Sequence, residues 1–320
     1  MPDIRIGISG WRYAPWRGVF YPEGLPQRQE LAWASRALPT IEINGSFYSL
    51  QKPQYYADWA AAVPDDFVFS VKAPRFVTHI RRLREIEKPL ANFFASGLFE
   101  LEHKLGPILW QFPPSLVYDA LLIEDFLLQL PMDDTAALKL ARSHEDWMEG
   151  RSSLPAAGGR SLRHAVEVRN VSFVDPMFID QLREHGVALV VADTAGKWPD
   201  HEDVTADFVY VRLHGHEQLY ASGYDDASLD SWARKIDAWS RGTQARDAQL
   251  IQPPGRVRGP QDREPKSRDV YCYFDNDIKV KAPFDAARLQ RRLKLDSTLD
   301  GAGHFEVELP PTDARQLPLA

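Results

Sequence analysis

The sequence has almost no cysteine and no long apolar run. Cys272 is the only cysteine among 320 residues, so no disulfide can form within the chain. A lone thiol inside an apolar run is typical of a small buried side chain. No stretch approaches the ~20 consecutive apolar residues that a membrane-spanning helix needs. Because no basic and then apolar leader precedes Ile4, we expect a cytoplasmic protein without a membrane partner.

The sequence also lacks two motifs that would assign a cofactor. Residues 9–12 read Ser-Gly-Trp-Arg, where a dinucleotide-binding fold would carry a glycine-rich phosphate loop. No short run of His, Cys and acidic residues has the spacing of metal ligands. We therefore predict no cofactor, while a divalent metal stays open as an alternative.

Composition and charge indicate a soluble globular protein. The chain is 44% hydrophobic and 26% charged, with a formal net charge of −7. This charge argues against broad, non-specific wrapping of nucleic acid. The length would allow two average domains, but single α/β barrels commonly reach about 250 residues or more.

Eight short β-rich runs alternate with amphipathic helical stretches, which predicts right-handed crossovers and a parallel sheet. Eight units in sequence, and no phosphate loop after the first, favour a closed barrel over an open doubly wound sheet. We predict an α/β fold: a single (β/α)8 TIM barrel over residues 1–295, then a poorly ordered tail over 296–320. The predicted strands are Ile4–Ser9, Thr40–Ile43, Phe67–Val71, Ile108–Gln111, Ala165–Val168, Ala188–Ala192, Phe208–Leu213 and Val270–Phe274.

Two extra segments fit none of the eight units. Asp133–Arg160 comes before strand five, and Thr243–Arg268 comes before strand eight. Both connect a helix to the following strand, and such connections lie at the end of the barrel away from the site. We therefore interpret both segments as solvated loops. Thr194–Thr205, after strand six, resembles a loop more than a helix.

The predicted strands end in polar side chains. In a parallel barrel the carboxyl ends of the strands meet at one face, and the chemistry lies there. Side chains alternate across a strand, so the polar ends share the lumen. Barrel interiors are normally apolar, which favours ligand recognition over a salt-bridged plug. The candidate site residues at these ends are Trp11, Glu42, Asn44, Lys72, Gln111, Glu167, Arg169, Asp193, Arg212, His214, Asp275 and Asn276.

The acids and bases of this set suggest proton transfer. Glu167 is the first candidate for a base and Glu42 the second, because a carboxylate close to cations stays ionised. His214 can move a proton near neutral pH. Arg169 and Arg212 suit bidentate binding of a carboxylate or phosphate.

Lys72 and Asp193 complete the catalytic candidates. A desolvated Lys72 could form a Schiff base with a carbonyl substrate, or it could pair with Glu42 on the neighbouring strand. Asp193, with Glu167, His214 and Asp275, offers the donors of a divalent metal site, which three nearby cations disfavour.

The loop after strand three carries a local excess of positive charge. From Lys72 to Lys88 there are six Lys or Arg residues against two Glu residues, with His79 beside them. On an acidic protein this excess suggests an anionic ligand, although a solvated helix face would look the same. Trp11 and Tyr48 belong to a group of aromatics that could stack on a sugar or a base, or could fill the barrel rim.

At these motifs the chain resembles the YecE-like family, also called the DUF72 family. The resemblance spans nearly all of residues 1–295, implies a TIM barrel and assigns no activity. The grouping of this family with sugar isomerases rests on the shared fold, and a shared fold does not establish a shared reaction. The matching runs are IGISGWRYAPWRGVFYPEGLP at 6–26, IEINGSFYSLQKP at 41–53, FSVKAPRFVTHIRRL at 69–83, LGPILWQFPPS at 105–115, AVEVRN at 165–170, VVADTAGKWP at 190–199, ADFVYVRLHGHEQLYASGY at 206–224 and VYCYFDNDIKVKAPFDA at 270–286.

Three functions remain open from the sequence. The leading hypothesis is an enzyme that acts by proton transfer on a small anionic or sugar-like ligand, such as a sugar phosphate. A metal-dependent hydrolase or isomerase is the second. A non-catalytic module that binds an anion or a nucleic-acid end through the 72–88 loop is the third.

Overall fold

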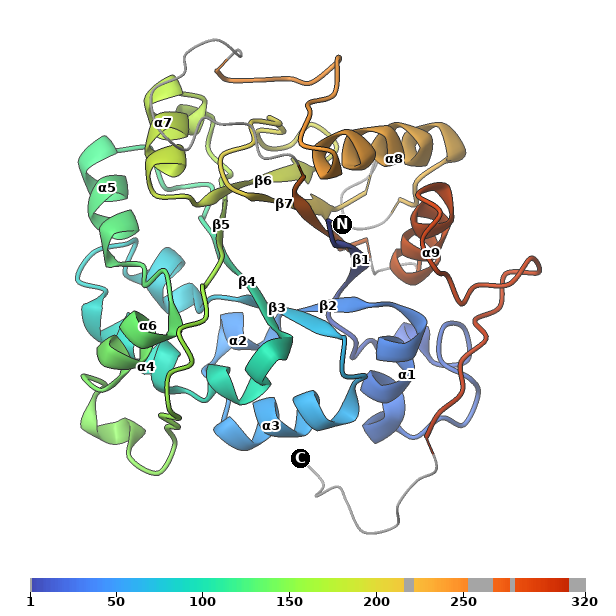
Figure 1. Cartoon of the computed structure of the whole chain (residues 1–320), viewed down its shortest axis with the longest axis horizontal. Coiled ribbons are helices and arrows are strands. Elements are labelled where there is room, and N and C mark those ends of the chain that lie inside the picture. The colour runs from blue at the N-terminus through green and yellow to red at the C-terminus, as the bar shows by residue number, and fades with distance from the viewer. Residues whose placement is uncertain (1, 216–221, 253–266, 277–279, 311–320) are drawn as a thin grey trace.

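The chain forms a closed barrel of parallel strands, which confirms the predicted α/β class. This computed structural model describes residues 2–215, 222–252, 267–276 and 280–310. Each strand pairs with the next, and the last pairs with the first. Figure 1 shows the strands at the centre with helices around them. The strands are β1 (Ile4–Ser9), β2 (Thr40–Ile43), β3 (Val68–Lys72), β4 (Leu105–Gln111), β5 (His164–Glu167), β6 (Ala188–Asp193), β7 (Phe208–Leu213) and β8 (Asp269–Phe274).

The strand bounds agree closely with the alternating pattern. β1, β2 and β7 begin and end at the predicted residues. β4 begins at Leu105, earlier than predicted. The sequence predicted a later start because Gly106 and Pro107 are residue types typical of turns. Gly106 fits there because a Cβ atom would lie 2.5 Å from a Val68 side-chain carbon on the neighbouring strand.

The helices pack on the outside of the barrel. Asp175 caps α7 as the sequence predicts: its carboxylate accepts a hydrogen bond from the Met177 N–H, and Pro176 opens the helix. Within the described ranges, none of the helices is long and apolar enough to cross a bilayer. The α-helices are α1 (Glu30–Ala37), α2 (Gly45–Tyr48), α3 (Pro53–Ala62), α4 (Glu87–Ala95), α5 (Ala120–Gln129), α6 (Asp134–Ala141), α7 (Pro176–Glu184), α8 (Asp226–Ser240) and α9 (Ala282–Arg292), with short helical turns at Ala14–Trp16, Gln27–Gln29, Phe76–Ile80, Leu98–Lys104, Asp146–Met148 and Val171–Phe173.

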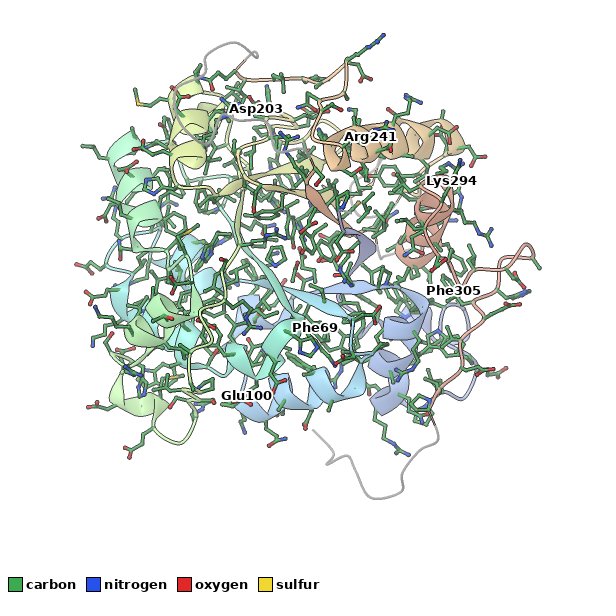
Figure 2. All side chains as sticks on the ribbon, viewed as in Figure 1. Phe69, Glu100, Asp203, Arg241, Lys294 and Phe305 are labelled. Carbon is green, nitrogen blue, oxygen red and sulfur yellow. The ribbon has the colours of Figure 1, made fainter. Side chains whose placement is uncertain are left out.

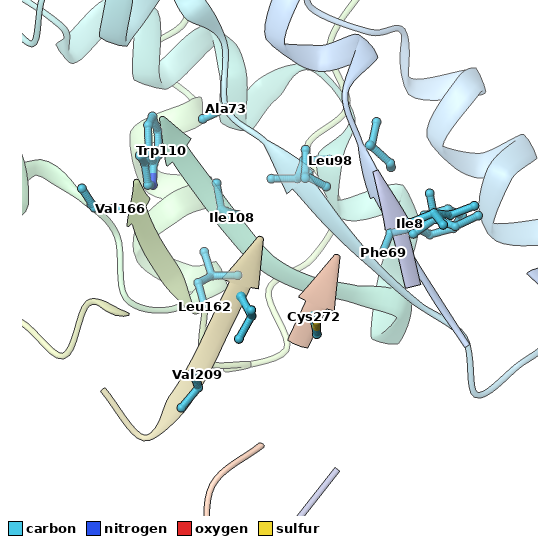
Figure 3. Close-up of a cluster of buried hydrophobic side chains, with 14 of the residues drawn as sticks. Ile8, Phe69, Ala73, Leu98, Ile108, Trp110, Leu162, Val166, Val209 and Cys272 are labelled. Carbon is cyan, nitrogen blue, oxygen red and sulfur yellow. The ribbon is translucent and has the colours of Figure 1, made fainter. Parts of the chain in front are cut away.

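Alternating side chains divide the core into two layers. Figure 3 shows part of the layer between strands and helices, including Ile8, Ile108, Val209 and the predicted buried thiol Cys272. A separate apolar cluster fills the lumen. It consists of Leu109, Ala165, Ala188, Val190, Ala192, Phe208, Tyr210, Tyr271 and Tyr273.

The first extra segment, residues 133–160, is more than the solvated loop that we expected. Its first part forms α6, which packs against α4 and buries Ala137 and Ala141 completely. The Asp134 carboxylate accepts hydrogen bonds from the backbone N–H groups of Gly158 and Gly159. With only eight residues, this helix is too short to show a clear helical period in the sequence.

The second extra segment is described only at 243–252 and 267–268. The backbone N–H groups of Ile251 and Gln252 donate to the Asp203 carboxylate, which holds the described part against the loop after β6. Residues 194–205, all of them described, contain no helix, as predicted.

Residues 296–310, part of the segment that we expected to be poorly ordered, pack against the barrel. The Phe305 ring lies 5.0 Å from that of Phe20 and 5.3 Å from that of Phe284, measured between ring centroids. Figure 2 labels Phe305 close to α9. Residues 311–320 lie outside the described residues.

Replacing Phe305 with alanine should lower the free energy of unfolding by about 1 kcal/mol, because two aromatic contacts are lost from a half-buried ring. Urea denaturation followed by tryptophan fluorescence measures this change. The exposed neighbour Glu306, changed to alanine, is the matched control. An unchanged unfolding midpoint for Phe305→Ala would show that the segment contributes nothing to stability.

Candidate functional site

The completely buried guanidinium of Arg212 forms the centre of the site. Its Nε and Nη2 atoms donate to the Glu42 carboxylate at 3.1 and 2.9 Å. Its Nη1 donates to Glu167 at 2.6 Å, and Nη2 also donates to Asp275 at 2.9 Å. Strands β2, β5 and β7 and the residue after β8 thus bring three carboxylates to one cation. Arg212 was predicted to clamp an anion, but its N–H groups are already occupied.

Both carboxylate oxygens of Glu42 accept hydrogen bonds. Besides its bonds with Arg212, its carboxylate accepts hydrogen bonds of 2.6 Å from the hydroxyls of Ser9 and Tyr210. Burial, with the nearby charge of Glu42, raises the pKa of Tyr210 well above its usual value, so the phenol stays protonated and donates. Four hydrogen bonds fill the acceptor sites of one carboxylate. Glu42 therefore supports the buried part of the site, and its filled acceptor sites disfavour its predicted role as the second candidate base.

Glu167 is also almost completely buried and fully engaged. In addition to Arg212, its carboxylate accepts hydrogen bonds from Gln111 Nε2 at 3.0 Å and Arg169 Nε at 2.7 Å. Burial alone would raise its pKa, but Arg169 and Arg212 outweigh burial and hold the pKa well below the usual range. Such a carboxylate stays ionised and has a low affinity for protons, which disfavours its predicted role as the base.

His214 and Asp275 form a pair at the edge of this network. The His214 Nδ1 atom lies 3.0 Å from Asp275 Oδ2, and its Nε2 lies 4.0 Å from Glu167 Oε2. His214 has no exposed surface, whereas the Asp275 side chain is 14% exposed. Burial would raise the pKa of Asp275, but Arg212 and the hydrogen bond with His214 bring it to about 2. Within this pair, only Asp275 is accessible to solvent.

Lys72 lies above the network and does not pair with Glu42. Its side chain is 8% exposed, and Nζ lies 4.2 Å from the centre of the Phe47 ring. In the part of the chain that the structure describes, Nζ makes no hydrogen bond and no ion pair. Burial, with repulsion from Arg212, lowers the pKa of Lys72 to about 8.

His79 lies close to Lys72 and Arg169, whose charges act on its ring. The His79 ring packs edge-on against Phe47, and its Nδ1 lies 2.8 Å from the Thr78 hydroxyl. Burial, with repulsion from Lys72 and Arg169, lowers the pKa of His79 to about 4, so the ring is neutral at pH 7. The Arg169 guanidinium lies 3.9 Å from the centre of the Trp198 ring.

Asn44 contributes an unsatisfied acceptor to the site. Its Nδ2 donates to the Ser9 hydroxyl at 2.8 Å. Its buried Oδ1 has no hydrogen-bond partner within the described ranges. A buried acceptor without a partner costs free energy, which a ligand hydroxyl could recover.

Four predicted site residues lie elsewhere. Asp193 projects from the face of β6 opposite the lumen residue Ala192 and lines a cavity of about 460 Å³ beside α8. Trp11 packs edge-on against Trp59 of α3, at 5.4 Å between ring centroids, in the layer between strands and helices. Tyr48 is exposed at the rim. Asn276 points away from the lumen, and its Nδ2 donates to Asp285 of α9 at 3.0 Å.

The metal and nucleic-acid alternatives gain no support from the described geometry. Among the described residues, no group of three or more His, Cys, Asp or Glu side chains is arranged to hold a metal ion. Arg81 pairs with Glu85 at 3.3 Å, and Arg82 donates to the Ser115 hydroxyl at 2.8 Å. Two cations of the 72–88 loop are thus engaged with neighbouring residues.

Three residues that shape the site are not among the predicted site residues: Ser9, Tyr210 and Trp198. The period of two places Tyr210 in the lumen with Arg212, but the sequence did not indicate that it binds Glu42. Ser9 ends β1 and lies opposite Glu42 in the strand register. No sequence pattern indicated a role for Trp198, which lies in the loop after β6 and contacts Arg169.

Comparison with known proteins agrees with this architecture. A DUF72 family protein from Thermotoga maritima MSB8 aligns with a TM-score of 0.67 and 22% identity, over 91% of this chain and 99% of that one. A DUF72 family protein from Enterococcus faecalis V583 aligns with a TM-score of 0.64 and 17% identity, over 98% and 100%. At these identities the likeness shows the fold alone.

Sequence relatives point to the same group. The UPF0759 protein YecE of Escherichia coli K12 is 24% identical over 244 residues, which are 75% of this chain and 83% of YecE. The UPF0759 protein YunF of Bacillus subtilis 168 is 29% identical over 116 residues, only 35% of this chain and 40% of YunF. The profile described as "Protein of unknown function DUF72" matches residues 5–304. The chain therefore belongs to the DUF72 family.

Proposed function

We propose that this protein is an enzyme that acts by proton transfer on a small anionic polar substrate, such as a sugar phosphate. The observation that supports this proposal is the division of the site into two levels. The lower level, which we call the buried network, consists of Ser9, Glu42, Glu167, Tyr210 and Arg212. The upper level, the open group, consists of Asn44, Lys72, His79, Arg169 and Asp275.

The open group favours an anion. Lys72 has no ion-pair partner within the described ranges, and the guanidinium of Arg169, which donates through Nε to Glu167, adds a second positive charge. The buried network beneath has two carboxylates against the single cation Arg212, so its net charge is −1. The open group has Lys72 and Arg169 against Asp275, so its net charge is +1. An anion bound between Lys72 and Arg169 would gain charge-assisted hydrogen bonds in a partly desolvated setting.

His79 is the group of the open level that is best suited to carry the proton. Its ring is neutral at pH 7 because burial and two cations depress its pKa. An anion that neutralises Lys72 and Arg169 would remove this repulsion and raise the pKa of His79 towards the operating pH. Asp275, with a pKa of about 2, stays ionised and instead fixes the orientation of His214.

A binding screen tests the ligand class. We expect glucose, fructose and ribose phosphates to raise the thermal unfolding midpoint, and their uncharged parent sugars to do so far less. A ligand at one hundred times its Kd adds about 2.7 kcal/mol of stability. Arg169→Gln should weaken binding about tenfold or more, since hydrogen bonds to charged groups contribute about 1.5–3 kcal/mol. The exposed Arg84, changed to glutamine, is the matched control from the neighbouring loop.

Isotope exchange tests the chemistry. In deuterated water, the enzyme should exchange the hydrogen next to the carbonyl carbon of a bound sugar phosphate, as NMR would show. His79→Gln should bind the ligand but lose most of the exchange. A protein that binds these phosphates without any exchange would be a binding module, and one that binds none of them would contradict the anionic substrate class.

A further inference from the structure

We infer that Lys72 is a nucleophile that forms an imine with a small anionic aldehyde or ketone. This inference deepens the proposed function, because it narrows the substrate class of the same site to carbonyl compounds. It begins from the setting of the lysine. Its side chain is more than nine-tenths buried at the end of β3, yet Nζ has no hydrogen-bond or ion-pair partner within the described ranges.

The carboxylate on the neighbouring strand β2, that of Glu42, has no acceptor site left for the amine. All four acceptor sites of Glu42 are filled by Ser9, Tyr210 and Arg212. Glu167 accepts three hydrogen bonds, and Asp275 accepts from Arg212 and His214 through the same oxygen. A charged ammonium needs acceptors for three N–H groups when it leaves water. This setting therefore favours the neutral amine or an incoming ligand oxygen.

The surroundings also fix the lysine in place. Nζ lies over the Phe47 ring at 4.2 Å from its centre, a cation–π contact that holds the side chain in position. The hydroxyl of Ser46, in the same short helix α2, donates to the Lys72 carbonyl oxygen at 2.7 Å, and the Ile43 carbonyl oxygen lies 3.2 Å from it. These contacts hold the ends of β2 and β3 together beneath the amine. A fixed, partly desolvated amine is the arrangement that Schiff-base enzymes use.

The protonation of Lys72 supports its reactivity. Burial and Arg212 lower its pKa to about 8. At pH 7 about a tenth of such an amine is neutral, compared with about 0.04% for an ordinary lysine. Only the neutral amine attacks a carbonyl carbon, so this difference raises the reactive fraction by about two orders of magnitude.

The reaction is balanced without an oxidant or a metal. The amine lone pair forms a bond to the carbonyl carbon, and the nitrogen proton passes to the carbonyl oxygen. The resulting carbinolamine loses its hydroxyl group with one more proton as water, which leaves the C=N bond. His79, in the open group, can relay these protons. A protonated imine acidifies the neighbouring C–H bond, which is the step that the proposed function requires.

Reductive trapping tests the inference on the intact protein. The wild-type protein is incubated with glyoxylate, an aldehyde that carries a carboxylate, and is then treated with sodium cyanoborohydride. Peptide mass spectrometry should find the adduct on Lys72 at least tenfold more than on Lys139, which is exposed. The rate at Lys72 should rise with pH through about 8, whereas that at an exposed lysine rises through about 10.4.

Variants separate the lysine from the anion site. Lys72→Met should abolish the fast adduct, and Lys139→Met should leave it unchanged. Arg169→Gln should slow trapping of glyoxylate but not of glycolaldehyde, which has no charge. Labelling of Lys72 in wild type that is no faster than that of Lys139 overturns the inference. If Lys72 is not labelled faster than Lys139 but the protein exchanges hydrogen in sugar phosphates, the imine is contradicted and the proposed function is retained. If Lys72 is labelled fast but no exchange occurs, the imine is supported and proton transfer on sugar phosphates is contradicted.

Discussion

Replacing Arg212 with methionine is expected to lower the free energy of unfolding by about 3–5 kcal/mol, the cost of removing one partner from a buried ion pair. The three carboxylates of Glu42, Glu167 and Asp275 would lose their shared cation in a part of the barrel with little access to water. Urea denaturation at pH 7, followed by circular dichroism and fluorescence, measures the change.

A double-mutant cycle identifies the cause of this loss. Glu42→Gln removes one of the uncompensated charges, so the double variant Arg212→Met/Glu42→Gln should lose less stability than the sum of the single variants, with a coupling of about 1–3 kcal/mol. The exposed Arg84, changed to methionine, should alter stability by less than about 0.5 kcal/mol. Strict additivity of the Arg212 and Glu42 variants would contradict the buried network.

The stabilising contribution of Asp275 is expected to disappear on acidification. Its pKa is about 2 in the folded protein, compared with about 3.9 in an unfolded chain. A carboxylate with a depressed folded pKa stabilises fully above its unfolded pKa, and this contribution is lost as the pH falls through the folded pKa. Asp275→Asn should therefore be less stable than wild type by about 2 kcal/mol at pH 7, and the difference should shrink from about pH 4 towards pH 2.

Urea titrations of both proteins between pH 7 and pH 2 measure this difference. The exposed Asp146, changed to asparagine, serves as the control, and its small effect should not follow the same pH course. A gap between wild type and Asp275→Asn that stays constant down to pH 2 would mean that Asp275 does not interact with Arg212 and His214 as ionised groups.

The barrel could be predicted from sequence because its signals are local. The run Phe208–Leu213 is short, apolar and bounded by loops, and it is β7 at those residues. The period of two along that strand also assigned Tyr210 and Arg212 to the lumen, where both lie. A strand that is buried on both faces leaves few other positions for a charged side chain.

The choice of partners within the site could not be predicted from sequence. Whether Lys72 pairs with Glu42 depends on which donors have already filled that carboxylate, and Tyr210 and Arg212 come from β7, on another part of the barrel. In β6, the side chain of Ala192 faces the lumen. Because side chains alternate along a strand, the next residue, Asp193, faces outward. Trp11 lies beyond the end of β1, where alternation no longer applies.

The pairing of β1 with β8 affects how the protein must be made. Ile4 pairs with Val270 and Ile8 with Phe274, so the barrel cannot close until the last strand has been synthesised. At about 5–20 residues per second, β1 would wait on the order of tens of seconds beside the ribosome with one edge unpaired. During that time Arg212 would also lack Asp275. Newly made chains should therefore depend on molecular chaperones until β8 emerges, because an unpaired strand edge invites association with other chains.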